Sequence, residues 1–136
     1  MAGNKIVIST IKIIDSLPFI ELSIHFRGSS VFLHNVLVDA GSATSILKLE
    51  LVEKIGIKAE PEDCIGSVAG VGGKEFVFIK KIDSIEICGF RMNNIGMDIG
   101  VMDYGADIDG ILGMDILSRI QAVIDLESST ISGKPA

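Results

Sequence analysis

The feature that most constrains this chain is the apolar run at residues 36–38, which ends directly on Asp39 and leads into Ala40, Gly41 and Ser42. Aliphatic and β-branched residues favour a buried strand, whereas a carboxylate is costly to bury without a partner. A buried strand that ends on an aspartate followed by a glycine turn therefore predicts a loop in which the carboxylate has a function. We expect Gly41 to let the backbone approach the Asp39 carboxylate and Ser42 to donate its hydroxyl to it.

A second signature lies far downstream, at residues 109–115, and reads Asp-Gly-Ile-Leu-Gly-Met-Asp. A short helix is predicted at 115–120, with Asp115 as its cap, because a carboxylate accepts hydrogen bonds from the first free N–H groups of a helix. The clearest helix is predicted at 44–55, where Leu47, Leu51 and Ile55 recur every four residues ahead of Gly56, a residue typical of helix ends.

The rest of the chain is predicted to be strands. Alternating or continuous Ile, Leu and Val between turn residues indicates strands rather than helices. They are expected at 5–14, 19–26, 31–39, on both sides of the glycines at 70–74 within 64–87, and at 91–101, 122–126 and 130–132. A chain of 136 residues with this order predicts one domain, 1–136, and a mostly β, closed, barrel-like fold with one or two short helices.

Composition and charge limit the kinds of partner that the chain is expected to bind. The net charge of −6 without a basic cluster argues against nucleic acid or an anionic membrane surface, and no apolar run approaches the roughly 20 residues of a membrane span. The first ten residues do not resemble a signal peptide. Cys64 and Cys88 are expected to be reduced thiols of a cytoplasmic protein, Cys88 within the core. His25 and His34 stand on separate strands, so no metal and no cofactor is expected.

The chemistry open to Asp39 is hydrolysis by an activated water. Without a metal or a covalent nucleophile, one group must take a proton from water while another donates a proton to the carbonyl. A single carboxylate cannot do both at once. Two carboxylates about 3 Å apart can, because they cannot both ionise and therefore share a proton.

These pieces, in this order, resemble the retropepsin-like aspartic proteases over residues 20–131, and residues 109–115 look similar to those of bacterial aspartyl proteases. The resemblance implies a closed retropepsin-like (acid protease) β-barrel half-lobe that cleaves a peptide or protein substrate as an endopeptidase. It also implies roles for particular residues: Asp39 as the catalytic acid, Ala40, Gly41 and Ser42 as the catalytic loop, Gly70, Val71, Gly72 and Gly73 as a substrate-covering flap, and Ile111, Leu112 and Gly113 as a brace behind the loop.

The chain carries one full copy of the catalytic signature. Asp98 and Asp103 also precede a glycine by two residues, but neither follows a long apolar strand, and both are predicted to lie in solvated acidic loops. If Asp39 is the only catalytic acid, its partner must be Asp39 of a second copy. A two-fold axis between the loops supplies that pair, so a homodimer is expected.

Ala40 is the departure from the family pattern, which usually has Thr or Ser at this position. Its missing hydroxyl removes about 1 kcal/mol per hydrogen bond across the dimer axis. Three interpretations remain open: a weak protease, an inactive relative that serves as a dimerisation or peptide-binding module, and an engineered substitution. Self-processing of a longer precursor is a further alternative.

Overall fold

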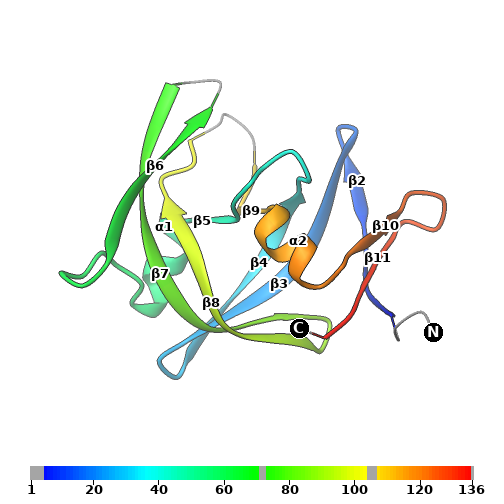
Figure 1. Ribbon diagram of the computed structural model, residues 1–136, viewed down its shortest axis with the longest axis horizontal. Helices are drawn as coiled ribbons and strands as arrows, with labels where there is room; N and C mark the ends of the chain where they lie inside the picture. Colours follow the sequence, from blue (N-terminus) through cyan, green and yellow to red (C-terminus); the bar gives the residue numbers. More distant parts are fainter. Residues whose placement is uncertain (1–4, 71–72, 104–106, 136) are drawn as a thin grey trace.

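The computed structural model describes residues 5–70, 73–103 and 107–135, which form a mostly β structure with two short helices (Figure 1). The predicted fold class is confirmed. In chain order the elements are β1 (Ile6–Thr10), β2 (Lys12–Ile14), β3 (Leu17–Phe26), β4 (Ser29–Val38), β5 (Ile46–Lys48), α1 (Leu49–Val52), the 3₁₀ turn η1 (Glu53–Ile55), β6 (Cys64–Gly70), β7 (Gly73–Ile87), β8 (Phe90–Gly100), β9 (Gly110–Leu112), α2 (Met114–Arg119), β10 (Val123–Asp125) and β11 (Thr130–Gly133).

Six strands close into a barrel. The large sheet runs β2-β3-β4-β9-β5-β8-β7-β6. A further pairing of β3 with β7 closes the strands from β3 to β7 in this order into a ring, and β2 and β6 extend beyond it. Strand β9 lies parallel to β4 and antiparallel to β5, so it enters the barrel between two strands from the first half of the chain. Closure removes sheet edges within the ring.

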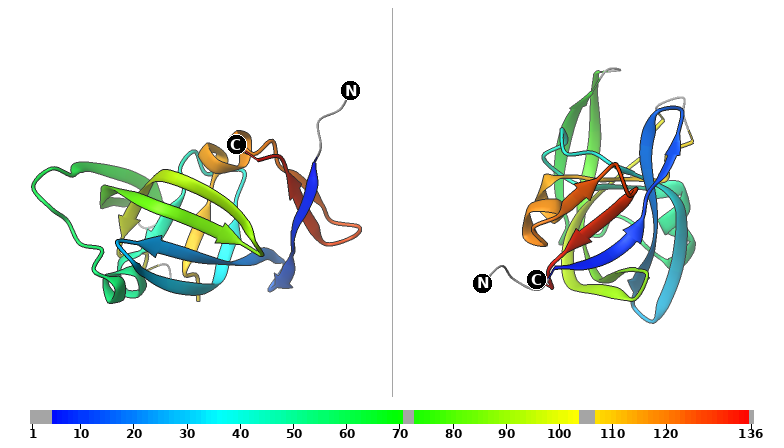
Figure 2. Two further views of the ribbon diagram at one scale, coloured as in Figure 1. Left: turned by 90° about the horizontal axis from the view of Figure 1, so that it is seen from below. Right: turned by 90° about the vertical axis from the view of Figure 1, so that its right-hand side faces the viewer.

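A second, three-stranded sheet, β1-β11-β10, stands beside the barrel and brings the two ends of the described chain together (Figure 2). The main apolar core fills the barrel and is built mostly of Ile and Leu, with fewer Val, Phe and Met residues, and Ile24, Leu47 and Ile99 are among its fully buried members. This composition follows from the scarcity of aromatic residues, which make up 5% of the chain.

The predicted helix at 44–55 is wrong over its first half. Ile46 and Leu47 belong to β5, which is hydrogen-bonded to β8 on one side and to β9 on the other. Both side chains are buried, so the strand pairing overrides the four-residue spacing. Helix begins only at Leu49, and the expected ending is confirmed, because Gly56 has a φ of 88° in the left-handed region.

Two other predictions need correction. The strand expected at 5–14 is two strands, because Ile11 donates its N–H to the Ser129 carbonyl and is buried between β1 and β2. Cys88 is not a core residue: it is exposed, and it turns the chain between β7 and β8 with a φ of 47°. Across the described ranges, no helix is both long and apolar enough to cross a bilayer.

Candidate functional site

Asp39 emerges at the end of β4, where the strand leaves the barrel. Its backbone N–H donates to the Leu112 carbonyl of β9 at 2.9 Å, so the parallel neighbour fixes the point at which the loop begins. The Gly41 N–H donates to Asp39 Oδ1 at 2.9 Å. A Cβ at Gly41 would lie 3.1 Å from that oxygen, a tight contact that glycine avoids. The carboxylate is half-buried and is therefore both oriented and accessible.

The predicted hydrogen bond from Ser42 to the carboxylate is wrong. The Ser42 hydroxyl donates to the Thr44 carbonyl at 2.8 Å, and its N–H donates to the Asp39 carbonyl. Both contacts close the loop on itself, because serine readily bonds to backbone two residues away. Ser42 therefore shapes the loop, and Gly41 holds the carboxylate.

The turn after β9 packs directly against the loop that follows Asp39. A Cβ at Gly113 would lie 2.5 Å from the Thr44 carbonyl oxygen and 2.8 Å from that of Ser42, distances that only glycine permits. The Met114 N–H also donates to the Ser42 carbonyl at 2.8 Å. Ile111, Leu112 and Gly113 thus lie where the resemblance placed a brace, although their role stays a prediction.

Ser45 is a site residue that the sequence did not single out. It is fully buried, and its hydroxyl donates to Asp115 Oδ1 at 2.7 Å while accepting from the Gly113 N–H at 2.8 Å. Its own N–H donates to Asp115 Oδ2 at 3.0 Å. The predicted cap position is wrong, because the cap of α2 is Gly113 and Asp115 lies within its first turn, where its Oδ1 accepts the Ile116 N–H at 2.8 Å. Asp115 also ties α2 to the end of the loop that follows Asp39.

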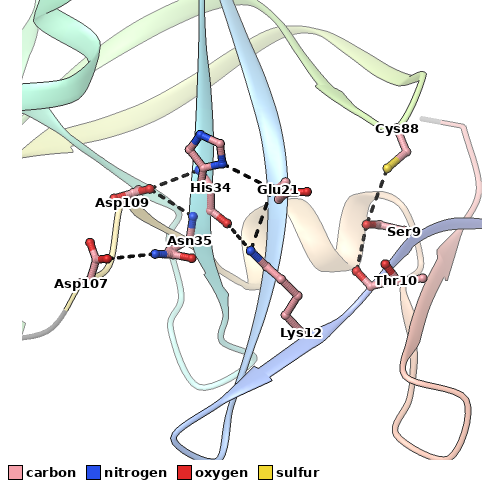
Figure 3. A network of polar contacts seen from close by, with 9 residues as sticks. All are labelled: Ser9, Thr10, Lys12, Glu21, His34, Asn35, Cys88, Asp107 and Asp109. Carbon is pink, nitrogen blue, oxygen red and sulfur yellow. Dashed lines mark hydrogen bonds and ion pairs between the residues drawn. The ribbon is translucent and has the colours of Figure 1, made fainter.

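Asp109 joins the two signatures from the other side (Figure 3). Its carboxylate accepts the backbone N–H groups of His34 and Asn35 on β4, at 3.2 Å and 3.0 Å. Its own N–H donates to the Asn35 carbonyl at 2.8 Å. Asp107 adds a contact from the Asn35 amide at 3.1 Å. These contacts start β9 in register with β4, so that Leu112 pairs with Val38 and its carbonyl accepts the Asp39 N–H.

Asp98 does not lie in a solvated loop, as was predicted, but within β8, where it is partly buried. Burial raises the pKa of its carboxyl, the hydroxyl of Thr44 partly offsets this effect, and the nearby charge of Asp115 adds to it. Its neighbours are Thr44 and Asp115, at the end of the loop that follows Asp39. For the other alternative, Asp103 is described, but residues 104–106 of its motif lie outside the described residues.

The hairpin formed by β6 and β7 projects from the barrel (Figure 1). Gly70 pairs with Gly73 at its end, whereas Val71 and Gly72, predicted as part of the flap, lie outside the described residues. The base of the hairpin is held by Lys80, which is buried and forms ion pairs with Asp63 and Glu60. Hydrogen bonds from Lys80 and then Arg27 lower the pKa of the Glu60 carboxyl to about 2.

A second apolar cluster joins β7 of this hairpin to β4 and β9. Leu37, two residues before Asp39, pairs with Ile111 of β9, and both pack partly exposed against the cluster. Val77 reaches it from β7. The buried members of the cluster are Phe19, Ile46, Val77, Met102 and Ile108. Leu37 and Ile111 thus connect β4 and β9, the two strands beside Asp39, to an apolar cluster that β7 also joins.

Comparison with known proteins points to one family. A family model described as aspartyl protease matches residues 22–116, which include both signatures. DNA damage-inducible protein 1 of Neurospora crassa is 28% identical over 127 residues, which are 88% of this chain and 26% of that protein. The chain thus spans about a quarter of the length of this relative.

A similar structure has also been solved. A retropepsin-like aspartic protease from Rickettsia conorii superposes with a TM-score of 0.66 and covers 96% of this chain and 91% of that one, at 22% sequence identity. At this identity the likeness shows the fold, and the expected retropepsin-like β-barrel is confirmed.

Proposed function

The chain belongs to the aspartyl protease family, and from this premise we propose that it is an endopeptidase whose active site forms between two copies. Each copy contributes Asp39 as the catalytic acid. The observation that carries the proposal is the loop geometry: a half-buried carboxylate at a strand end, oriented by the Gly41 N–H at 2.9 Å. A fixed, accessible carboxylate is what general acid–base catalysis requires.

The second copy is required by the reaction. One Asp39 carboxylate takes the proton of the attacking water, while the other, protonated, donates to the carbonyl oxygen of the scissile bond. This step forms a tetrahedral gem-diol and exchanges the protonation states of the two Asp39 groups. The C–N bond then breaks as the newly protonated carboxyl donates its proton to the nitrogen and the other carboxylate takes a proton from the gem-diol, so that a carboxylic acid and an amine leave and the original protonation states return. The pair titrates as a unit, so the two pKa values belong to the dyad and not to either residue.

The substrate is proposed to be an extended peptide. It would lie between the catalytic loop and the β6–β7 hairpin, whose connection at residues 70–73 acts as the flap. Leu37 and Ile111 border the second apolar cluster on this path. Apolar side chains next to the cleaved bond are therefore favoured, since their burial is worth about 25 cal/mol per Å².

The test replaces Asp39 with Asn, which keeps the size of the side chain and an oxygen for the Gly41 N–H. We expect peptidase activity to fall at least ~10³-fold, because neither proton transfer can then occur. Cleavage of a peptide library would be measured together with sedimentation, which should show an unchanged dimer. An Asp39→Asn chain that cleaves at the wild-type rate would exclude the mechanism.

A second candidate function is supported by Ala40, which is exposed and cannot form a hydroxyl hydrogen bond across the axis. In this case the chain is a silent dimerisation or peptide-binding module of the same fold. Ala40→Thr restores the hydroxyl. If neither the parent nor Ala40→Thr cleaves any peptide between pH 3 and pH 7, the silent function is favoured.

A cytoplasmic location is also part of the proposal. It rests on Cys64 and Cys88, which the structure shows as exposed free thiols. Exposed thiols persist in reducing compartments.

A further inference from the structure

The hairpin formed by β2 and β3 extends beyond the end of β4 at which Asp39 lies. Its register with β4 pairs Phe19 with Leu37, so residues before Phe19 run past the end of β4 on the side where Asp39 emerges. Ile14 pairs with Leu17, which leaves Asp15 and Ser16 as a two-residue turn. Figure 1 shows this turn projecting at the same end of the barrel as the β6–β7 hairpin.

The tip of this hairpin is apolar and exposed. Ile13, Ile14 and Leu17 are 54%, 41% and 41% exposed. Asp15 and Ser16 have φ values of 51° and 64°, a left-handed turn that side-chain-bearing residues adopt at a cost. The turns at 27–28 and 88–89 have the same shape, but each has glycine as its second residue. A defined turn thus presents three aliphatic side chains to solvent.

A matching recess lies next to Ala40. It is a pocket of about 180 Å³ whose walls include Ala40, Met114, Leu117 and Ser118 of α2, and Ile124 of β10. The recess is open to solvent, and its volume is similar to that of a cavity that holds benzene, so one aliphatic side chain is of a size to occupy it. Among the described residues, none from β6 or β7 lines the pocket, which separates it from the proposed peptide path.

We propose that the tip of the β2–β3 hairpin of each copy inserts into the α2–β10 pocket of the other copy. The inference rests on the proposed function, because it is the shared Asp39 pair that brings two copies together at this surface. Ala40 follows Asp39 and lines the pocket, so an axis between two Asp39 residues makes the pocket face the partner. A two-fold axis turns one tip and one pocket per chain into two equal contacts.

The primary test places a charge at the tip. Ile14→Glu should raise the dimer dissociation constant at least about tenfold, because a carboxylate would enter an apolar pocket. Val7→Glu is the matched control: Val7 is 65% exposed on β1, so it changes the dissociation constant only if the terminal sheet forms the interface. Adding Ser118→Lys to Ile14→Glu should recover at least half of the lost affinity. Unchanged dimerisation of Ile14→Glu, or the absence of any rescue, overturns the assignment.

A cross-linking test does not depend on how tightly the two copies bind. In a background with Cys64→Ser and Cys88→Ser, the pair Ile14→Cys and Ser118→Cys is treated with a short bis-maleimide. We expect a cross-linked dimer in denaturing gels, and none from the pair Val7→Cys and Ser118→Cys. Cross-linking within single chains only, or none at all, contradicts the exchange of tips.

The two proposals fail differently. If the chain dimerises through the tips but cleaves no peptide, the interface stands and the peptidase is wrong. If the chain cleaves peptides in an Asp39-dependent way while Ile14→Glu dimerises normally, the peptidase stands and the interface is wrong.

Discussion

At the scale of single residues, the loop is governed by which atoms can approach the Asp39 carboxylate and the loop backbone. A Cβ at Gly41 would lie 3.1 Å from a carboxylate oxygen of Asp39, and a Cβ at Gly113 would lie 2.5 Å from the Thr44 carbonyl oxygen. Ser45 connects the end of the loop to Gly113 and Asp115 through one buried hydroxyl. The acid that remains costly is Asp98, whose surroundings favour its neutral form.

Asp98→Asn should therefore stabilise the protein at neutral pH. Because burial raises the pKa of Asp98 above its unfolded value, the folded state holds the proton more tightly and loses stability as the group ionises. The amide removes this loss, so the melting temperature should rise at pH 7 and gain less at pH 3.5. Thermal unfolding at both pH values, at one protein concentration, measures the effect.

Asp125→Asn is a control that should change the stability in the opposite direction. Hydrogen bonds from the Ser128 backbone and side chain lower the pKa of Asp125, with the Glu127 N–H adding to them. Its substitution should lower the melting temperature at pH 7. Equal shifts of the Asp98 variant at both pH values would contradict the role given to burial.

At the scale of elements, the β6–β7 hairpin depends on charges at its base. The segment before β6 contributes Glu60 and Asp63, β7 contributes the buried Lys80, and the β3–β4 turn contributes Arg27. Burial of Lys80 opposes its charge, but the hydrogen bonds to Asp63 and Glu60 prevail and raise its pKa. The pairs thus anchor the hairpin where it leaves the barrel.

This anchor predicts a window of acid sensitivity. The Glu60 pKa falls from 4.5 to about 2 in the folded state, so its contribution is complete above pH 4.5 and is lost as the pH falls toward 2. Glu60→Gln should be less stable than the parent at pH 7 and should show a smaller loss between pH 4.5 and pH 2. Glu127→Gln, at an exposed turn position, is the control. If Glu60→Gln loses as much stability as the parent between pH 4.5 and pH 2, groups other than Glu60 cause the loss.

At the scale of the whole molecule, half of the proposed site lies on each chain. A mixed dimer of one wild-type chain and one Asp39→Asn chain therefore cannot share a proton between carboxylates. When the inactive Asp39→Asn chain is added in tenfold excess, random pairing leaves about a tenth of the wild-type chains in wild-type dimers. Peptidase activity should fall to that level. Activity that does not respond to the excess would show that one chain suffices.

The sequence predicted the strands better than the segments that long-range pairing controls. Strand positions follow from alternation, and the loop at Asp39 follows from a local change from aliphatic residues to glycine. The segment at 46–48 looked helical, because its partners β8 and β9 lie far along the chain. The contact between Ser45 and Asp115 spans 70 residues, and no local pattern reveals it. Cys88 continued an apparent strand, although the chain turns there.

The parallel pairing of β4 with β9 also bears on how the molecule is made. Asn35 and Asp109 are 74 residues apart, and the backbone behind Asp39 is complete only when both are present. Such distant contacts are slow to form. During synthesis on the ribosome, the first signature thus waits unassembled until the second signature, at residues 109–115, has also emerged. We expect the proposed peptidase to gain any activity only after that point, so that nascent chains do not cut their neighbours.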